Sequence, residues 1–182
     1  MSELPEPQWS ALRTLASALN DVEVEWRLGG SALLAIFGVD AEVHDLDITV
    51  AADSLEAVEV ACEAWVRQRH VGDAPPPWCS DWLLKASIND AEVDLIGGFC
   101  VLGPSGRTHV PQDLGGILDV DGIEVPLADP AVWWWVYRIY KPTKAAALAD
   151  RIPPERRDRA VARLEGKDGP PQQPGERCSP RG

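Results

Sequence analysis

The chain has 182 residues, of which 45% are hydrophobic, and its formal net charge is −12. This length and composition favour one globular domain with a real core and argue against a largely disordered chain. Neither an apolar run of about 18 residues nor a basic segment followed by an apolar one occurs, so we expect no membrane span and no signal peptide. The four cysteines lack CxxC spacing, which predicts reduced thiols in a cytoplasmic protein rather than a structural zinc site.

The charge is distributed unevenly along the chain. Residues 1–130 hold 23 acidic and 6 basic side chains, whereas residues 131–182 hold 6 acidic and 11 basic ones. An acidic body argues against nonspecific binding to nucleic acid, which depends on neutralising phosphates. It suits divalent cations, through which phosphorylated substrates can still bind. The basic end leaves contact with nucleic acid open for one face only.

The first half of the sequence predicts helices that alternate with strands. Apolar side chains at helical spacing, such as Trp9, Leu12 and Leu15, indicate the first helix. Ser31 fits the N-cap or the first turn of the second helix, directly after Gly29-Gly30. The predicted elements are a helix over 7–20, a strand over 22–28, a short helix over 32–38, a strand over 44–51, a helix over 54–69 and a loop over the prolines of 73–78.

The second half predicts two hairpins followed by helices. Asn89-Asp90 and Asp121-Gly122 are typical turn pairs, and Asp129 with Pro130 is typical of a helix start. The predicted elements are strands over 81–88 and 91–99, an irregular connection over 102–116, a hairpin over 117–127, helices over 129–141, 143–152 and 153–166, and a disordered tail from Lys167. The expected fold is α+β, a mixed sheet flanked by helices, with a core at 1–128, a C-terminal helical region at 129–166 and the tail at 167–182.

Two aspartates lie one residue apart in a predicted strand. Asp45 and Asp47 project to the same face, while Leu46 and Ile48 face the other way. Two unpaired carboxylates this close repel each other, and a divalent cation such as Mg²⁺ removes the conflict. Asp94 is a third aspartate in an apolar strand, and three carboxylates from two strands are able to hold two metal ions.

The turn at Gly29, Gly30 and Ser31 is the second half of the predicted site. A glycine pair between a strand and a helix lets the backbone approach a ligand, and the helix N-terminus offers free N–H groups to a phosphate. Taken alone, these glycines are more often only a tight strand-to-helix turn, and an aspartate pair alone is more often a solvated strand edge. The combination of turn and aspartates in this order favours a phosphate and metal site.

These residues resemble a known family. The sequence "GGSALLAIFG…HDLDITV…EVDLI" resembles the DNA polymerase β-type nucleotidyltransferase superfamily over about residues 22–150. The superfamily includes minimal nucleotidyltransferases, antibiotic (aminoglycoside and lincosamide) nucleotidyltransferases and AbiEii/MenT-like toxins. The resemblance implies a fold with a mixed sheet and a Mg²⁺-dependent transfer of a nucleoside monophosphate from NTP.

The resemblance also implies roles for particular residues. Gly29, Gly30 and Ser31 would hold the triphosphate, with Gly30 and Ser31 touching phosphate. Asp45 and Asp47 would bind two Mg²⁺ ions, and Asp94 would complete the site as metal ligand and general base. A lysine from the later helices would reach the nucleotide; Lys144 is the first candidate for this role and Lys141 the second.

One position departs from the pattern of the superfamily. Many relatives place an arginine and a threonine before the aspartate pair, where this chain has Ala41 and Val43. The departure removes one helper for phosphate binding or strand packing, so the resemblance supports the fold more than the activity. His44 either substitutes as a donor or is a surface residue beside the site.

Two further clusters have a plain explanation and a functional one. Trp133, Trp134 and Trp135 cannot share one helix face, so at least one belongs to the core, while another is available for base stacking. The second cluster is a group of arginines in the last predicted helix, and it is either a solvated helix face or a patch that contacts RNA. It comprises Arg156, Arg157, Arg159 and Arg163.

The predicted function is therefore nucleotidyl transfer to a hydroxyl of an unidentified acceptor. The acceptor is a small molecule such as an antibiotic, or a tRNA or protein if the chain is a toxin with an antitoxin partner. A cationic small molecule suits the acidic body, and RNA suits the basic C-terminal helices. The alternatives are a catalytically degenerate protein that binds a nucleotide or a partner, and a structural domain in which the carboxylates meet by coincidence.

Overall fold

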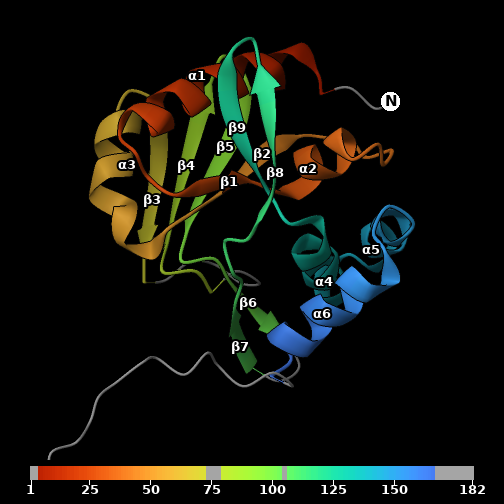
Figure 1. The fold of residues 1–182 in the computed structure, drawn as a ribbon. Helices are drawn as coiled ribbons and strands as arrows, with labels where there is room; N and C mark the ends of the chain where they lie inside the picture. Colours follow the sequence, from red (N-terminus) through yellow and green to blue (C-terminus); the bar gives the residue numbers. More distant parts are fainter. Residues whose placement is uncertain (1–3, 73–78, 104–105, 167–182) are drawn as a thin grey trace, which may run out of the picture.

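A seven-stranded mixed sheet forms the centre of the molecule (Figure 1). The computed structural model describes residues 4–72, 79–103 and 106–166, so the predicted loop at 73–78 and the tail at 167–182 lie outside the described residues. The strand order is β3-β4-β5-β2-β1-β9-β8, and β6 and β7 form a separate hairpin. The strands are β1 Trp26–Leu28, β2 Asp45–Val50, β3 Val66–Val71, β4 Trp82–Ile88, β5 Ala91–Gly97, β6 Cys100–Gly103, β7 Gly106–His109, β8 Leu114–Val120 and β9 Ile123–Ala128.

The register of the three central strands lines up side chains from different parts of the chain. Strand β2 runs parallel to β5 and places Asp47 opposite Asp94. Strand β4 runs antiparallel to β5 and places Lys85 opposite Asp94. Because directly opposite residues point to the same face of a sheet, these three side chains form one row across it. The neighbours Leu46 and Ile48 face the other way and are fully buried.

Helices cover the sheet and gather at one end of it. Helices α1 and α3 contact each other beside the sheet, while α4, α5 and α6 lie together at the end where the β6–β7 hairpin projects (Figure 1). One hydrophobic cluster extends from Leu4 to Leu164, so the C-terminal helices share the core of the sheet. The helices are α1 Glu6–Asp21, α2 Gly30–Ile36, a 3₁₀ turn at Ala52–Ser54, α3 Leu55–Cys62, α4 Pro130–Tyr140, α5 Pro142–Ala149 and α6 Pro154–Leu164.

The turn and cap signals of the sequence are confirmed. Asn89 and Asp90 have φ of 48° and 65° between β4 and β5, and Asp121 and Gly122 have φ of 55° and 84° between β8 and β9. Left-handed values at both central residues are those of the tight turns that join antiparallel strands. Asp129 caps α4, because its side chain accepts a hydrogen bond from the amide of Ala131 at 2.7 Å. The expectation of a mixed sheet flanked by helices is correct.

Three boundaries differ from the sequence-based prediction. The strand expected over 22–28 begins only at Trp26, because the chain leaves α1 through a left-handed residue, Glu23 with φ 53°. The helix expected over 54–69 ends at Cys62, and Val66–Val71 instead pairs with β4 as an edge strand. The connection expected to be irregular over 102–116 contains the β6–β7 hairpin and the start of β8.

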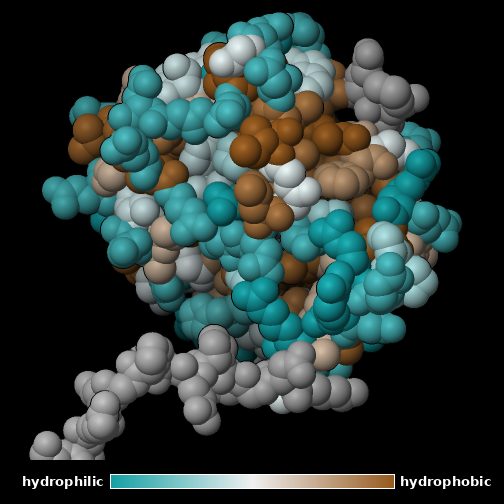
Figure 2. Space-filling model, in the orientation of Figure 1, coloured by the Kyte–Doolittle hydropathy of each residue, from teal (hydrophilic) through white to brown (hydrophobic). Residues whose placement is uncertain are grey.

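The face seen in Figure 2 is mixed in polarity. Apolar side chains gather there over β8, the edge strand of the sheet, where Leu114 and Ile117 are half exposed. Polar side chains cover most of the remaining face. Among the described residues, none of the helices combines the length and apolar character needed to cross a bilayer.

Candidate active site

The three predicted carboxylates meet at one place on the sheet. One oxygen from each of Asp45, Asp47 and Asp94 lies within 4.8 Å of the others, and each residue is partly buried. Residues 45 and 47 share a face of β2, and the parallel pairing of β2 with β5 brings Asp94 beside them. The trio is the one group of three or more acidic, cysteine or histidine ligands with this spacing in the described part of the chain.

The pKa of the Asp47 carboxyl is strongly raised. Burial, and then the charges of Asp45 and Asp94, raise the pKa of its carboxyl to about 7, against the opposing effect of Lys141 and Lys144. A carboxylate with this pKa lacks enough positive charge nearby to hold it ionised. A divalent cation with oxygen ligands would supply that charge, so the donor set fits a Mg²⁺-type ion.

Asp94 differs from its neighbours because it already has a cation. Nζ of Lys85 lies 2.9 Å from both oxygens of the Asp94 carboxylate. Burial raises the pKa of Asp94, and the hydrogen bonds and charge of Lys85 oppose this rise. Sequence reasoning did not single out Lys85, although a lysine within the apolar strand "WLLKASI" is the same kind of signal that identified Asp94.

The two glycines of the turn are required by close packing. A Cβ atom on Gly30 would lie 1.9 Å from Oδ2 of Asp47, and a Cβ atom on Gly29 would lie 2.1 Å from Cζ2 of Trp133. The amide of Gly29 donates to the carbonyl of Asp47 at 2.8 Å, which fixes the turn against β2. The turn therefore lies directly against the aspartate pair, as the order of motifs in the sequence predicted.

Ser31 lies in the first turn of α2 and does not cap the helix. Gly29 is the N-cap residue, and no side chain caps this end. The Ser31 hydroxyl instead accepts a hydrogen bond from Nζ of Lys144 at 2.6 Å and is hydrogen-bonded to the phenol of Tyr137. The structure thus brings Ser31 to the lysine that was the first candidate for contact with the nucleotide.

The C-terminal helices add two lysines to the positive charge that Lys85 provides at this site. Burial, and then the neighbouring charge of Lys141, lowers the pKa of Lys144, while Asp47 and Asp45 act in the opposite direction. Lys141 is exposed, at the junction of α4 and α5. Its charge acts on Asp47, so the second candidate also lies near the carboxylates. The two lysines and three aspartates form a mixed-charge cluster suited to a metal-bound polyphosphate.

Tyr137 and Trp133 of α4 form the wall behind the turn, and the sequence analysis assigned no role to Tyr137. Both side chains are buried, and their ring centroids lie 5.6 Å apart. Burial, and then the charge of Asp47, raises the pKa of the Tyr137 phenol. Trp133 stacks on Phe99 with a centroid distance of 5.3 Å. The i, i+4 spacing of Trp133 and Tyr137 was the available signal, because it places both on one helix face.

Several other candidates lie away from this cluster. The His44 side chain is 74% exposed and pairs with Glu42, with 3.3 Å between His44 Nε2 and Glu42 Oε2. Val43 is buried and Ala41 is partly buried, so both positions serve packing. The expected donor role of His44 has no support in this geometry.

The tryptophan and arginine clusters are mostly used within the fold. Trp133 and Trp135 are buried, and the Trp134 ring lies under the guanidinium groups of Arg138 and Arg157, at 5.0 and 5.5 Å from the ring centroid. Arg156 pairs with Asp129 at 2.9 Å, and Arg163 pairs with Asp113. These contacts engage most members of both clusters, whereas Arg159 is exposed.

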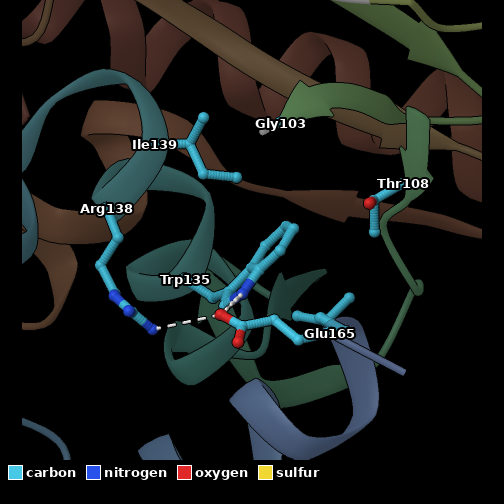
Figure 3. A pocket seen from close by; sticks show the side chains of 7 residues that line it. Gly103, Thr108, Trp135, Arg138, Ile139 and Glu165 are labelled. Atoms are coloured by element: carbon cyan, nitrogen blue, oxygen red, sulfur yellow. Dashed lines mark hydrogen bonds and ion pairs between the residues drawn. The ribbon is translucent and has the colours of Figure 1, made fainter. Parts of the chain in front are cut away.

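A cavity of about 400 Å³ lies beside α4 but outside the carboxylate site (Figure 3). It is lined from the β6–β7 hairpin, α4 and the end of α6, including Thr108, Ile139 and Leu164. The indole of Trp135 donates to Glu165 at 3.2 Å, and Arg138 pairs with the same carboxylate at 3.6 Å. Trp135 and Ile139 lie on a different face of α4 from Trp133 and Tyr137, so this cavity is distinct from the site.

Comparison with solved structures identifies the fold. A presumed nucleotidyltransferase of Thermotoga maritima superposes with a TM-score of 0.66 at 22% identity, over 81% of this chain and 94% of the other. The antibiotic-resistance factor ANT(2″)-Ia, solved with adenylyl-2″-tobramycin, superposes with a TM-score of 0.55 at 11% identity, over 88% and 98% of the two chains. Its solution structure gives 0.57 at 12% identity, over 90% and 94%.

These neighbours define the fold of the chain. The chain has the fold of the nucleotidyltransferases, and it carries a carboxylate trio close enough to bind a metal at the face of the sheet. No protein-family model matches the sequence, and no curated protein matches it. The fold shared with these solved structures supports the resemblance that was stated from the glycine-serine turn and the aspartates.

Proposed function

We propose that the protein is a Mg²⁺-dependent nucleotidyltransferase that moves a nucleoside monophosphate from NTP to a hydroxyl of an acceptor. The observation that carries the proposal is the cluster of Asp45, Asp47 and Asp94 within 4.8 Å, with Ser31 and Lys144 bonded to each other beside it. Residues 1–128 would supply the metal ligands, and residues 129–166 would supply the lysines that hold phosphate.

Different residues would bind the metal and the triphosphate. Asp45 and Asp47 would hold the metal, with Asp94 as the third ligand. Bound Mg²⁺, in two ions, would neutralise the triphosphate and lower the pKa of the attacking hydroxyl. Gly29, Gly30 and Ser31 would place the triphosphate against the backbone of the turn, and Lys144 and Lys141 would neutralise its charge.

The chemical step is an in-line displacement at the α-phosphorus. The acceptor oxygen forms a bond to this phosphorus, the bond to the β-phosphate oxygen breaks, and pyrophosphate leaves. The acceptor proton would pass to Asp94, whose carboxylate is held in place by Lys85 through contacts with both its oxygens. Catalysis would depend on positioning and charge neutralisation more than on covalent chemistry by the protein.

A polycationic small molecule is the acceptor class that we favour. One structural neighbour was solved with adenylyl-2″-tobramycin, an aminoglycoside product. The acidic body of this chain would attract a polycation to the site. An RNA acceptor, or an antitoxin partner, has weaker support because Arg156 and Arg163 are paired with Asp129 and Asp113.

Transfer of a labelled α-phosphate to an acceptor tests the proposal. The purified protein would be incubated with each of the four α-labelled NTPs and Mg²⁺, with tobramycin, with tRNA or without an added acceptor. Label on tobramycin, lost in Asp47→Asn, supports a small-molecule transferase, whereas label on tRNA or on the protein itself identifies the other acceptor class.

The alternative is a degenerate protein that binds a nucleotide or a partner without catalysis, and it is motivated by Ala41 and Val43 at the departing positions. Calorimetry separates the two. NTP binding that needs Mg²⁺ but gives no pyrophosphate with any acceptor favours the binding module. Absence of NTP binding, with or without metal, overturns the nucleotidyltransferase proposal.

A further inference from the structure

A pair of cysteines forms a second cluster of reactive side chains, outside the carboxylate site. Cys79 lies just before β4, and Cys100 is the first residue of β6. Their Sγ atoms are 2.8 Å apart, and the amide of Cys79 donates to the carbonyl of Cys100 at 3.1 Å. The two sulfurs are close enough that a small shift would allow a disulfide, whose S–S bond is about 2.0 Å long, to form between them.

The positively charged guanidinium of Arg107 lies beside one of the two sulfurs, Sγ of Cys100. Its Nε donates to Sγ of Cys100 at 3.2 Å, and its guanidinium is held by Asp81 at 2.9 Å. The Cys79 thiol also donates to Sγ of Cys100. The guanidinium and the second thiol thus both donate to Sγ of Cys100, which holds this sulfur beside Cys79 for disulfide exchange.

The two thiols differ in access to solvent. Cys100 is fully buried, whereas Cys79 is partly exposed. Burial, and then the hydrogen bond to Cys100, raises the pKa of Cys79 to about 11, so Cys79 holds the shared proton. An external reagent therefore reaches Cys79, and Cys100 is positioned directly behind it to react with whatever forms there.

Metal binding explains the pair less well than oxidation does. A closed thiolate site for zinc takes four ligands. In the described ranges 4–72, 79–103 and 106–166, no set of three or more ligand residues includes either cysteine. Two thiols alone match the requirement of a disulfide.

We propose that Cys79 and Cys100 are a redox-active thiol pair that closes to an intramolecular disulfide on reaction with a low-molecular-weight disulfide such as glutathione disulfide. Cys79 first gives up its proton, and its thiolate attacks one sulfur of the reagent; a mixed disulfide forms, and the leaving thiolate takes up a proton as the first thiol. Sγ of Cys100 then attacks Sγ of Cys79, the second reagent sulfur leaves as a thiolate, and it takes up the proton that Cys100 gives up. Two protein thiols are oxidised, and one reagent disulfide is reduced to two thiols.

The sequence gives a direct assay, because trypsin separates all four cysteines. Cys62, Cys79, Cys100 and Cys178 fall on the peptides 28–67, 70–85, 86–107 and 178–181. The folded protein would be treated with glutathione disulfide, alkylated and digested. We expect peptide 70–85 linked to peptide 86–107, with two hydrogen atoms fewer than the separate peptides, and loss of this species after dithiothreitol.

Variants distinguish the order of the two steps. In Cys100→Ser the second step is absent, so a glutathione adduct should accumulate on peptide 70–85. In Cys79→Ser neither adduct nor linked peptide should form at the pair, because Cys100 is buried. Cys62→Ser is the matched control and should leave the linked peptide unchanged. Circular dichroism of each variant separates loss of reactivity from loss of fold.

Other outcomes overturn the proposal. Wild-type protein that remains fully alkylated at both cysteines, or that stops at the mixed disulfide on Cys79, shows that the pair does not close. A link from either cysteine to Cys62 or Cys178 shows that their proximity does not direct the chemistry. The assay uses neither nucleotide nor acceptor, so it is independent of the proposed transferase activity.

Discussion

The carboxylate of Asp47 occupies the space that a side chain on Gly30 would need. A Cβ atom at position 30 would lie 1.9 Å from Oδ2 of Asp47, and Gly30 has a left-handed φ of 62°. We therefore expect Gly30→Ala to displace the aspartate or the turn. Metal binding and any transferase activity should fall at least about 100-fold, as a loss of about 2.7 kcal/mol implies.

Gly38→Ala is the matched control for this change. Gly38 also has a left-handed φ, 75°, but the nearest atom to a Cβ there is 3.7 Å away. The Gly38→Ala variant should therefore lose only about 1 kcal/mol in the free energy of unfolding, from backbone strain. Mn²⁺ calorimetry and thermal unfolding of both variants check this, and equal metal binding in the two would contradict the close contact.

Asp47→Asn should stabilise the metal-free protein at high pH. The pKa of Asp47 is about 7 in the folded protein and 3.8 is its ordinary value, so between these values the folded state binds the extra proton. Stability from this group therefore falls as the pH rises from about 4 to 7. The variant should gain about 2 kcal/mol above pH 7, and little below pH 4, after allowance for partial exposure.

Urea unfolding in the presence of a chelator, at pH 4 and pH 8, measures the effect. Asp119→Asn is the control, because Asp119 is exposed on β8 and its bond to the Gly122 amide needs only an oxygen acceptor. That variant should be nearly neutral at both values. A loss of stability in Asp47→Asn at pH 8 would mean that the buried charge is already compensated.

Lys144→Met should weaken NTP binding more than Lys141→Met does. Lys144 is partly buried and donates to Ser31 at 2.6 Å, whereas Lys141 is exposed. A charged hydrogen bond at a partly buried site contributes about 1.5–3 kcal/mol, or roughly 10- to 100-fold in KM, and an exposed charge contributes less. Titration of the protein with NTP and Mg²⁺ compares the two variants, and the reverse ranking would assign the phosphate to Lys141.

Lys85→Met should change the pH dependence of the reaction rather than only its rate. Lys85 opposes the burial that raises the pKa of Asp94, so its removal lets that pKa rise. If Asp94 accepts the acceptor proton, the acidic limb of kcat/KM should move to higher pH in the variant. A uniform loss at every pH would indicate that Lys85 serves only the structure.

The effect of Lys85→Met on stability is expected to be modest. The pair is partly exposed, with 39% of the Lys85 side chain and 17% of the Asp94 side chain accessible, so removing the lysine should cost about 1–2 kcal/mol. The double variant with Asp94→Asn provides the test. It should recover most of this loss, because no uncompensated carboxylate remains.

The local motifs of the site could be predicted because each depends on short-range geometry. Residues 45 and 47 share a face in any strand, and a glycine pair with a serine favours a strand-to-helix turn. Asp94 was expected on a second strand, but the parallel pairing of β2 with β5 that brings it beside the aspartate pair was not predicted from local spacing. Lys85 and Tyr137 were not predicted as site residues, because they come close to the aspartates only when β4 and α4 pack beside them.

The failed predictions have a common physical cause. Apolar residues such as Val58, Cys62 and Val66 follow helical spacing, yet pairing of residues 66–71 with β4 at the sheet edge stabilises a strand there. The β6–β7 hairpin likewise forms among glycines that have weak strand preference, where Tyr140 donates to the carbonyl of Leu102. In both places contacts distant in sequence decide the local structure.

The position of β9 between β1 and β8 has a consequence for synthesis on the ribosome. Until residues 123–128 emerge, β1 has a neighbour on one side only, and the turn at Gly29 lacks the indole of Trp133 behind it. The lysines of α5 follow later still. A nascent chain would thus expose the acidic side chains of its first 130 residues without these lysines until residues 141–144 had also emerged.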